Sequence, residues 1–282
     1  MRLAFSAWAM RELPVDRQVD IVRRAGYLGI CLVSDPKFQT LEPTNIRGLL
    51  ADADLSLTAI AGHANLLATD PDELAANKAW IRHGLDLTAE LAGPSGPPPL
   101  VSMGYGTSET YESDRQVLAE RFGELAGYAQ GLGGTLALEA HVGQAMDLPE
   151  RVVWLMEAVG SPHFRLNFDN SHFEVMGCDL DEYVPLLAPY AVHTDVKDQR
   201  GRSPDHEFLV PGEGDFDYAR YLRALDRAGY TGDVTIEISV MVQRRANYDP
   251  ADVAVRSHRT LVDAARRAGV ALGYRGATIG AT

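Results

Sequence analysis

The chain has 282 residues, of which 46% are hydrophobic and 23% charged, a composition typical of a globular protein with a sizeable core. Its formal net charge of −13 argues against a nucleic-acid partner, because the protein's field repels a phosphate backbone. Two isolated cysteines exclude a disulfide framework and a zinc finger, and neither a membrane-length apolar run nor a signal peptide is found, so we expect a cytoplasmic protein.

Short apolar runs alternate with longer amphipathic segments along the whole chain. Strands are predicted at residues 3–6, 28–33, 56–61, 100–103, 135–140, 164–169, 191–195 and 233–238. Between them the apolar residues recur at spacings of three and four, as one buried helix face requires. This pattern predicts helices at residues 15–25, 70–92, 113–131, 148–159, 216–228 and 250–268.

Each of the eight predicted strands is followed by a helix or by a segment of helical length. That count predicts an α/β fold, a single (β/α)8 or TIM barrel over residues 1–272. The second unit is the least regular, because residues 34–44 are loop-like before a short helix. Residues 273–282 are small and polar, so we expect a disordered tail there.

Carboxylates stand at the ends of four consecutive predicted strands. In a parallel barrel the functional groups lie at the C-terminal ends of the strands. The apolar runs that end at 139, 169, 195 and 237 finish in Glu139, Asp169, Asp195 and Glu237. Four carboxylates converging on one axis repel each other unless a cation lies between them. The sequence therefore favours one divalent metal ion over the alternative, separate ion pairs with arginines from the loops.

The seventh predicted strand leaves the identity of its ligand open. His193 and Asp195 are two residues apart and so face the same side of the strand. Asp195 lies nearer the C-terminal end and is the first choice. In that case His193 lies one layer deeper, where it orients a ligand or the substrate. A set of oxygen ligands with one imidazole suits manganese best among the candidates, which also include magnesium, cobalt, iron and zinc.

Four segments carry a resemblance to a known family: LALEAH, RLNFDNSHF, VHTDVKD with the later VPGEGDFDY, and VTIEIS. Together they resemble the xylose isomerase-like superfamily of TIM barrels, which includes sugar-phosphate isomerases and epimerases, ketose 3-epimerases, inosose dehydratases and endonuclease IV. The resemblance covers nearly the whole chain. It implies that Glu139, Asp169, Asp195 and Glu237 bind one metal. The family commonly has His-x-Lys-Asp at the seventh strand, where this chain has Asp195-Val-Lys197-Asp198.

The resemblance also implies a reaction. A metal that bridges a carbonyl and the neighbouring hydroxyl acidifies the hydrogen on the carbon beside the carbonyl. By resemblance, Glu139 and Glu237 remove and return that proton through an enediolate intermediate, and His172 contacts the substrate as a further catalytic group. We expect His63, His193 and Lys197 to bind the substrate as well. The predicted function is therefore isomerisation or epimerisation of a small sugar or keto-sugar.

Three alternatives differ from this prediction in class. A lyase, either a dehydratase or an eliminase, acts on a keto-sugar, keto-glycoside or inosose through the same intermediate, and the sequence does not separate it from an epimerase. A repair endonuclease needs a three-metal cluster and a basic groove, which the negative charge disfavours. A sugar-binding protein without activity does not need four carboxylates. Substrate, native metal and oligomeric state stay open, although the long helices and the loop after the seventh strand could support a homo-oligomer.

Overall fold

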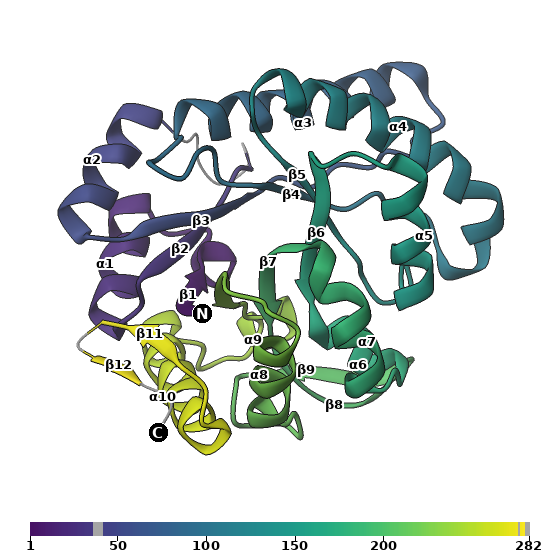
Figure 1. Cartoon of the computed structure of the whole chain (residues 1–282). Helices are drawn as coiled ribbons and strands as arrows, with labels where there is room; N and C mark the ends of the chain where they lie inside the picture. Colours follow the sequence, from purple (N-terminus) through teal and green to yellow (C-terminus); the bar gives the residue numbers. More distant parts are fainter. Residues whose placement is uncertain (36–41, 276, 280–282) are drawn as a thin grey trace.

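The computed structural model describes residues 1–35, 42–275 and 277–279, and within them eight parallel strands form a closed barrel (Figure 1). The strands follow chain order around the barrel, and β1 pairs with β10 to close it. They are β1 (Arg2–Ser6), β2 (Gly29–Val33), β3 (Ser56–Ala61), β4 (Leu100–Ser102), β5 (Leu136–Glu139), β6 (Phe164–Asp169), β7 (Ala191–Val196) and β10 (Asp233–Ile236). Every one of them lies within two residues of its predicted range, so the predicted (β/α)8 barrel is confirmed.

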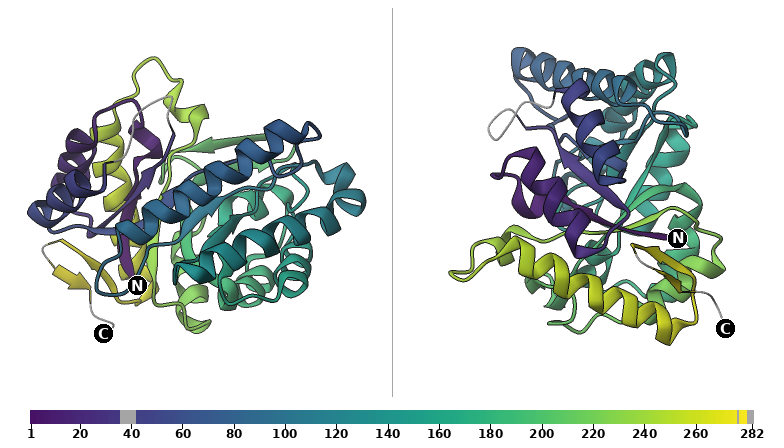
Figure 2. Two further views of the ribbon diagram at one scale, coloured as in Figure 1. Left: turned by 90° about the horizontal axis from the view of Figure 1, so that it is seen from above. Right: turned by 90° about the vertical axis from the view of Figure 1, so that its left-hand side faces the viewer.

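Helices surround the barrel on its outside, as two further views show (Figure 2). The main helices are α1 (Val15–Ala25), α2 (Pro43–Ala53), α3 (Pro71–Glu90), α4 (Tyr111–Gly131), α5 (Pro149–Val159), α7 (Leu180–Leu187), α8 (Tyr218–Arg227) and α10 (Pro250–Ala268). Sequence signals fix their ends: Asp70 caps α3 by accepting from two backbone N–H groups, and Gly26 ends α1 in the left-handed region. All six predicted helices are confirmed.

Shorter elements lie near the ends of the strands. They are the single-turn helices η1 (Ala7–Met10), η2 (Ser108–Thr110) and η3 (Ala188–Tyr190), with α6 (Asn170–Met176) and α9 (Val240–Gln243). After β7 the chain forms an antiparallel hairpin of β8 (Asp198–Arg202) and β9 (Asp205–Leu209). The hairpin and the helices α6, α7 and α9 were not predicted: α6 begins directly after the last residue of β6, α7 and α9 are short, and the hairpin sequence is mostly polar, with Phe208 and Leu209 at its end.

The tail differs from its prediction. Instead of disorder from residue 273, the structure has β11 (Leu272–Tyr274) paired with β12 (Ala277–Ile279), and β11 also pairs with β1 beside Arg2. Backbone pairing of β11 with β1 and with β12 therefore holds these residues. Residues 276 and 280–282 of the expected tail, and residues 36–41 of the expected loop at 34–44, lie outside the described residues.

Two clusters of buried apolar residues divide the interior. The larger one fills the space between the strands and the helices. The smaller one lies inside the barrel and consists of Cys31, Val33, Ala59, Ala61, Val101 and Ala137, with Trp8 packed against it. These are mostly small side chains, so they leave space above them at the C-terminal end of the barrel. Across the part of the chain that is described, no helix has the length and apolarity needed to cross a membrane.

Candidate metal centre and substrate pocket

The four carboxylates predicted from the strand ends lie at one rim of the barrel. Glu139 ends β5, Asp169 ends β6, Asp195 precedes the last residue of β7, and Glu237 directly follows β10. Strand pairing sets Asp169 beside Asp195, and the backbone N–H of Glu237 donates to the carbonyl oxygen of Val196 at 3.1 Å. Glu139, Asp169 and Asp195 are buried, and Glu237 is half-buried. Neighbouring strands thus bring the predicted ligands into one cluster.

Lys197 provides a positive charge inside this cluster. Its side chain is almost fully buried, and its Nζ donates to Asp169 and, at 2.8 Å, to Oε2 of Glu237. Burial disfavours the ammonium, but the surrounding carboxylates, Asp169 first, raise the pKa of Lys197 well above its ordinary value. Lys197 therefore stays charged, and it lies between two of the predicted metal ligands while also reaching the pocket described below.

The pKa values of the buried carboxyl groups are shifted in different directions. Burial, reinforced by the charge of Glu237, raises the pKa of Glu139 well above its ordinary value, and the same two causes raise the pKa of Asp195. For Asp169 burial also opposes ionisation, but Lys197 and His172 outweigh it and lower the pKa of that carboxyl. Lys197 thus compensates Asp169 and also pairs with Glu237, whereas the carboxyl groups of Glu139 and Asp195 have no ion pair with a lysine or arginine among the described residues.

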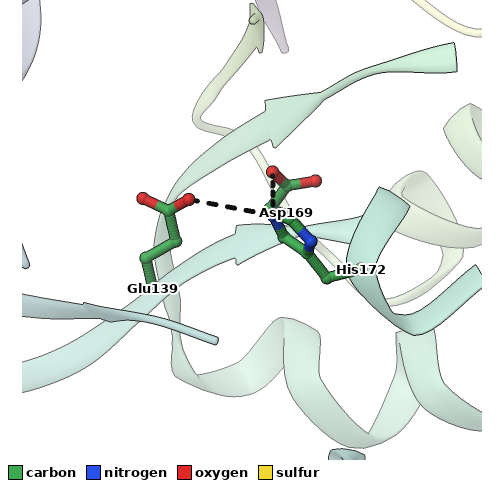
Figure 3. Close-up of side chains that lie close together, drawn as sticks. All are labelled: Glu139, Asp169 and His172. Atoms are coloured by element: carbon green, nitrogen blue, oxygen red, sulfur yellow. Dashed lines mark ion pairs between the residues drawn. The ribbon is translucent and has the colours of Figure 1, made fainter. Parts of the chain in front are cut away.

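His172 lies against two of these carboxylates (Figure 3). Its Nε2 is 3.3 Å from Oδ2 of Asp169 and 3.9 Å from Oε1 of Glu139. Donor atoms of these three residues lie within 4.8 Å of one another, close enough to surround one cation. The position follows from local structure, because Asp169 caps α6 by accepting from the N–H and hydroxyl of Ser171. Within the described chain, neither ring nitrogen of His172 makes a hydrogen bond.

Two further histidines flank the cluster. His63 follows β3, and its Nε2 is 3.7 Å from Oε2 of Glu139 while its ring meets Trp8 edge to face. Burial and the nearby Lys197 lower the pKa of His63 to about 4. His141 follows β5 and packs against the ring of His172 at 4.0 Å between centroids. Burial and His172 lower the pKa of His141 to about 3, so both rings are neutral at neutral pH.

His193 lies deeper in the barrel than the carboxylates. Its Nδ1 is 2.8 Å from Oδ1 of Asn167, and its Nε2 is 2.8 Å from the hydroxyl of Thr235 and 3.3 Å from that of Thr58. Burial lowers its pKa to about 3. Asn167 in turn donates to Oδ2 of Asp195 at 2.8 Å. His193 lines neither of the cavities described next, so of its two expected roles we carry forward the orientation of a ligand.

Two adjoining cavities open at this rim. The smaller, of about 10 Å³, has room for about one water-sized sphere and is lined by Glu139, Asp195 and Glu237 together with Cys31 and Ser6. The larger, of about 100 Å³, is lined by Glu139 and Glu237 again, with Trp8, His63, Met103, His141, His172, Lys197, Phe208, Ser239 and Val240. Most of the predicted site residues therefore face one of two connected spaces.

The residues around the smaller cavity fit a divalent cation. Oδ1 of Asp195 is buried without a hydrogen-bond partner among the described residues. The pKa values of Glu139 and Asp195 are raised because both carboxyls are buried and lie near the charge of Glu237. A cation among these oxygens satisfies the free atom and balances the charge, and carboxylate oxygen is the donor that hard divalent ions prefer.

Several residues of the site were not singled out in the sequence. Phe208 reaches the larger cavity from the β8–β9 hairpin, where its ring contacts His172 at 5.3 Å between centroids. Cys31 is a buried residue, as predicted, but it also forms the floor of the smaller cavity. The i, i+2 alternation from Val33 could have indicated the inward face for Cys31, whereas nothing in the mostly polar hairpin sequence shows that Phe208 reaches the site.

The carboxylate of Asp198 has a structural role. It accepts from the backbone N–H groups of Gly212, Gly214 and Phe216 at 2.7–3.1 Å and so ties the PGEGD turn to the start of β8. A Cβ at Gly214 would lie 2.3 Å from Oδ1 of Asp198, which explains the glycine. With its oxygens engaged in this way, Asp198 does not extend the carboxylate cluster, and Lys197 pairs with other partners.

Sequence comparison places the chain among characterised proteins. The family described as the xylose isomerase-like TIM barrel matches residues 19–264. The inosose dehydratase of Clostridium perfringens (strain 13 / Type A) is 24% identical over 163 residues, which cover 52% of this chain and 54% of the relative. The chain therefore spans about half the length of the curated relatives it matches.

Solved structures extend the likeness to nearly the whole chain. An L-ribulose 3-epimerase superposes with a TM-score of 0.75 at 19% identity, over 95% of this chain and 96% of its own. The IOLI protein, whose structure holds a zinc atom, gives a TM-score of 0.75 at 17% identity, over 95% of this chain and 98% of its own. At such identities the likeness shows the fold alone.

Proposed function

The chain belongs to the xylose isomerase-like TIM barrel family, and from this premise we propose that it is a divalent-metal-dependent isomerase or epimerase of a small sugar or keto-sugar. The observation that carries the proposal is the placement of Glu139 and Glu237, which line both cavities at the rim. They stand on β5 and after β10, with β6 and β7 between them. Two carboxylates that face one space from separated strands can remove a proton from a carbon and return one to it.

The proposed cation ligands are Glu139, Asp169, Asp195 and Glu237. Three of them line the smaller cavity, and Asp169 completes the set once Lys197 releases its carboxylate. When bound, the divalent ion acidifies the hydrogen beside a substrate carbonyl. Manganese is our first choice because most donors are oxygens, and zinc stays a candidate because an imidazole and a thiol, His172 and Cys31, lie beside them.

The chain's own residues perform the remaining steps of the proposed reaction. Glu139 takes up the proton, and Glu237 serves as the second acid or base at the same cavity. Lys197 directs its ammonium toward the developing negative charge on the substrate oxygen, because it lines the larger cavity and stays protonated. His172 and His63 offer ring nitrogens to substrate hydroxyls. Trp8 and Phe208 form apolar walls that limit access of water.

The cavity also indicates the size of the substrate. A volume of about 100 Å³ with two carboxylates, one ammonium and several imidazoles suits a small polyhydroxylated molecule with few carbons beyond its reacting centre. This supports a small carbohydrate as the partner.

A lyase reaction on a keto-sugar or inosose is the second candidate. It is favoured by the sequence relatives, which carry the name inosose dehydratase. The same proton abstraction begins both reactions, and they differ in whether a proton is returned or a hydroxyl leaves. His172 would protonate the departing hydroxyl, since its ring lines the larger cavity and its nitrogens make no hydrogen bond among the described residues.

Solvent deuterium tests the proposal directly. The protein, loaded with Mn²⁺, is incubated in D₂O with a panel of ketoses and keto-inositols and followed by NMR. We expect metal-dependent deuterium incorporation beside the carbonyl of one substrate, with a change of configuration for an epimerase or loss of water for a lyase. Glu139→Gln and Glu237→Gln should lower the rate by at least about 10²-fold.

Glu174→Gln is the matched control, because Glu174 is a partly buried carboxylate that binds the hydroxyl of Tyr183 and lines a different cavity. It should keep the exchange rate of the unmodified protein. Exchange that survives in both Glu139→Gln and Glu237→Gln, or that is absent across the whole panel, would contradict proton transfer at this site.

A further inference from the structure

A layer of polar side chains lies beneath the proposed metal centre. We call Thr58, Asn167, His193 and Thr235 the polar layer. Asn167, His193 and Thr235 each stand two residues before one of the carboxylates, so they point to the same side of their strands one step deeper. Barrel interiors are usually filled at this depth by branched apolar side chains. All four residues are at most 7% exposed, and burying such groups is unfavourable unless they are hydrogen-bonded.

The hydrogen bonds of the polar layer have one direction. The amide nitrogen of Asn167 lies 2.8 Å from Oδ2 of Asp195 and donates to it, as it would to a carboxylate that binds a cation. Its Oδ1 then accepts, so Nδ1 of His193 carries a hydrogen. In the neutral ring Nε2 is an acceptor, and it receives the hydroxyls of Thr235 and Thr58. The result is a chain of hydrogen bonds in which the threonine hydroxyls donate to His193, His193 donates to Asn167, and Asn167 donates to the carboxylate of Asp195.

These hydrogen bonds determine which oxygen of Asp195 is engaged and which is free. Oδ2 is held by Asn167, and Oδ1 faces the smaller cavity without a hydrogen-bond partner among the described residues. Thr58 stands on β3, which does not neighbour β7, so its contact with His193 crosses the barrel and fixes the ring from the far side. A carboxylate on a short side chain would otherwise rotate and exchange its two oxygens.

We propose that Asn167 and His193 are positioning residues that hold Asp195 with one oxygen directed at the cation. The inference rests on the proposed metal centre, since it assigns a function to the free oxygen. It accounts for the carboxylate of Asp195 at the position on β7 where the family commonly has a histidine. Hydrogen-bonded support of a ligand typically changes metal affinity about 10–100-fold.

Metal affinity of two matched variants tests the proposal. Asn167→Leu keeps the side-chain size but removes both hydrogen bonds, and Thr88→Val removes a buried hydroxyl hydrogen bond on α3, away from the site. Mn²⁺ binding is measured by competition with a fluorescent chelator. We expect the dissociation constant to rise about 10–100-fold in Asn167→Leu and to stay unchanged in Thr88→Val. A folded Asn167→Leu protein that binds Mn²⁺ as tightly as the unmodified protein would overturn the proposal.

The tautomer of His193 is a second readout that needs no metal. Nitrogen-15 NMR of the histidine rings in the metal-free protein should show His193 as a neutral ring with hydrogen on Nδ1. The opposite tautomer or a charged ring would overturn the proposal. This measurement uses the unmodified protein, so it holds even if Asn167→Leu fails to fold. An unmodified protein that binds no Mn²⁺ contradicts the proposed function and the positioning role together. Normal Mn²⁺ binding with the wrong tautomer contradicts the positioning role alone.

Discussion

The two halves of the barrel present different chemistry to the same interior. The strands β1 to β4 end in uncharged residues, namely Ser6, Val33, Ala61 and Ser102, and the small apolar cluster lies mainly in this half. Carboxylates stand at or next to the ends of β5, β6, β7 and β10, and the polar layer lies beneath them, except for Thr58, which stands on β3. The scaffold is shared, so the division arises from side chains alone.

The difference between the apolar half and the charged half explains how the carboxylate site is arranged. A wall of small apolar side chains opposite the carboxylates lowers the local polarity, which strengthens every charge interaction in the other half. It also leaves the two cavities between the halves. The charged half is stable only where each carboxylate has a partner. Lys197 and the polar layer supply partners for Asp169, Glu237 and one oxygen of Asp195.

The largest effect is expected from placing a charge in the apolar half. Val101 is almost fully buried and lines the smaller cavity from β4. In metal-free protein, Val101→Asp adds a further carboxylate beside Glu139, Asp195 and Glu237 with no cation to compensate it, so the free energy of unfolding should fall by about 5 kcal/mol, the upper end for an uncompensated buried charge. Urea denaturation measures it, with Val101→Ala as the control. If Val101→Asp is no less stable than Val101→Ala, the two halves are not electrostatically distinct.

Removing the internal cation of the charged half should have the next largest effect. Lys197→Met leaves Asp169 and Glu237 without their shared partner. In metal-free protein the free energy of unfolding should fall by about 3 kcal/mol, the lower end for a broken buried pair, because Glu237 retains contact with solvent.

The same variant should bind Mn²⁺ more tightly, since the competing ammonium no longer engages two of the proposed ligands. Calorimetric titration and thermal unfolding with and without Mn²⁺ report both quantities. A Lys197→Met protein with weakened Mn²⁺ binding would mean that the lysine supports the metal centre rather than competing with it.

The smallest effect is expected at the pocket wall. Phe208 covers His172 from the hairpin, and its ring lies 5.9 Å from Nζ of Lys197. Phe208→Leu should lower kcat/KM about tenfold, which corresponds to about 1.4 kcal/mol, without changing Mn²⁺ affinity. Phe122→Leu, a fully buried residue packed on Phe164, is the control and should change stability only. An unchanged kcat/KM in Phe208→Leu would show that the hairpin does not contribute to the pocket.

Most of the fold could be predicted because each strand is a buried apolar run and each main helix has one buried face. The elements that escaped prediction are short or lack such a pattern; α7 has a buried face but only eight residues and an internal proline. The helix α6 has seven residues and starts on the capping side chain of Asp169 without a loop. The β8–β9 hairpin is defined by backbone pairing between mostly polar residues, and β11 by pairing with β1 and β12. A local cap begins α6, and pairing with another strand forms the hairpin and β11.

Part of the candidate site could be predicted from the sequence for a similar reason. Strand ends identify Glu139, Asp169, Asp195 and Glu237, because parallel strands of a barrel finish at one rim. The pairing of Lys197 with the neighbouring strand depends on the path of a long side chain, which no spacing rule predicts. Asn167 and Thr235 were missed although a signal existed: both repeat the two-residue offset from a carboxylate that was noted for His193.

Metal content tests the central claim most directly. Protein purified without chelator is subjected to elemental analysis, together with Glu139→Gln and Glu237→Gln and the control Glu174→Gln. The account predicts one divalent ion per chain in the unmodified protein and in Glu174→Gln, and loss of that ion in the other two variants. A metal-free unmodified protein whose melting temperature does not rise when Mn²⁺, Co²⁺, Mg²⁺ or Zn²⁺ is added would contradict it.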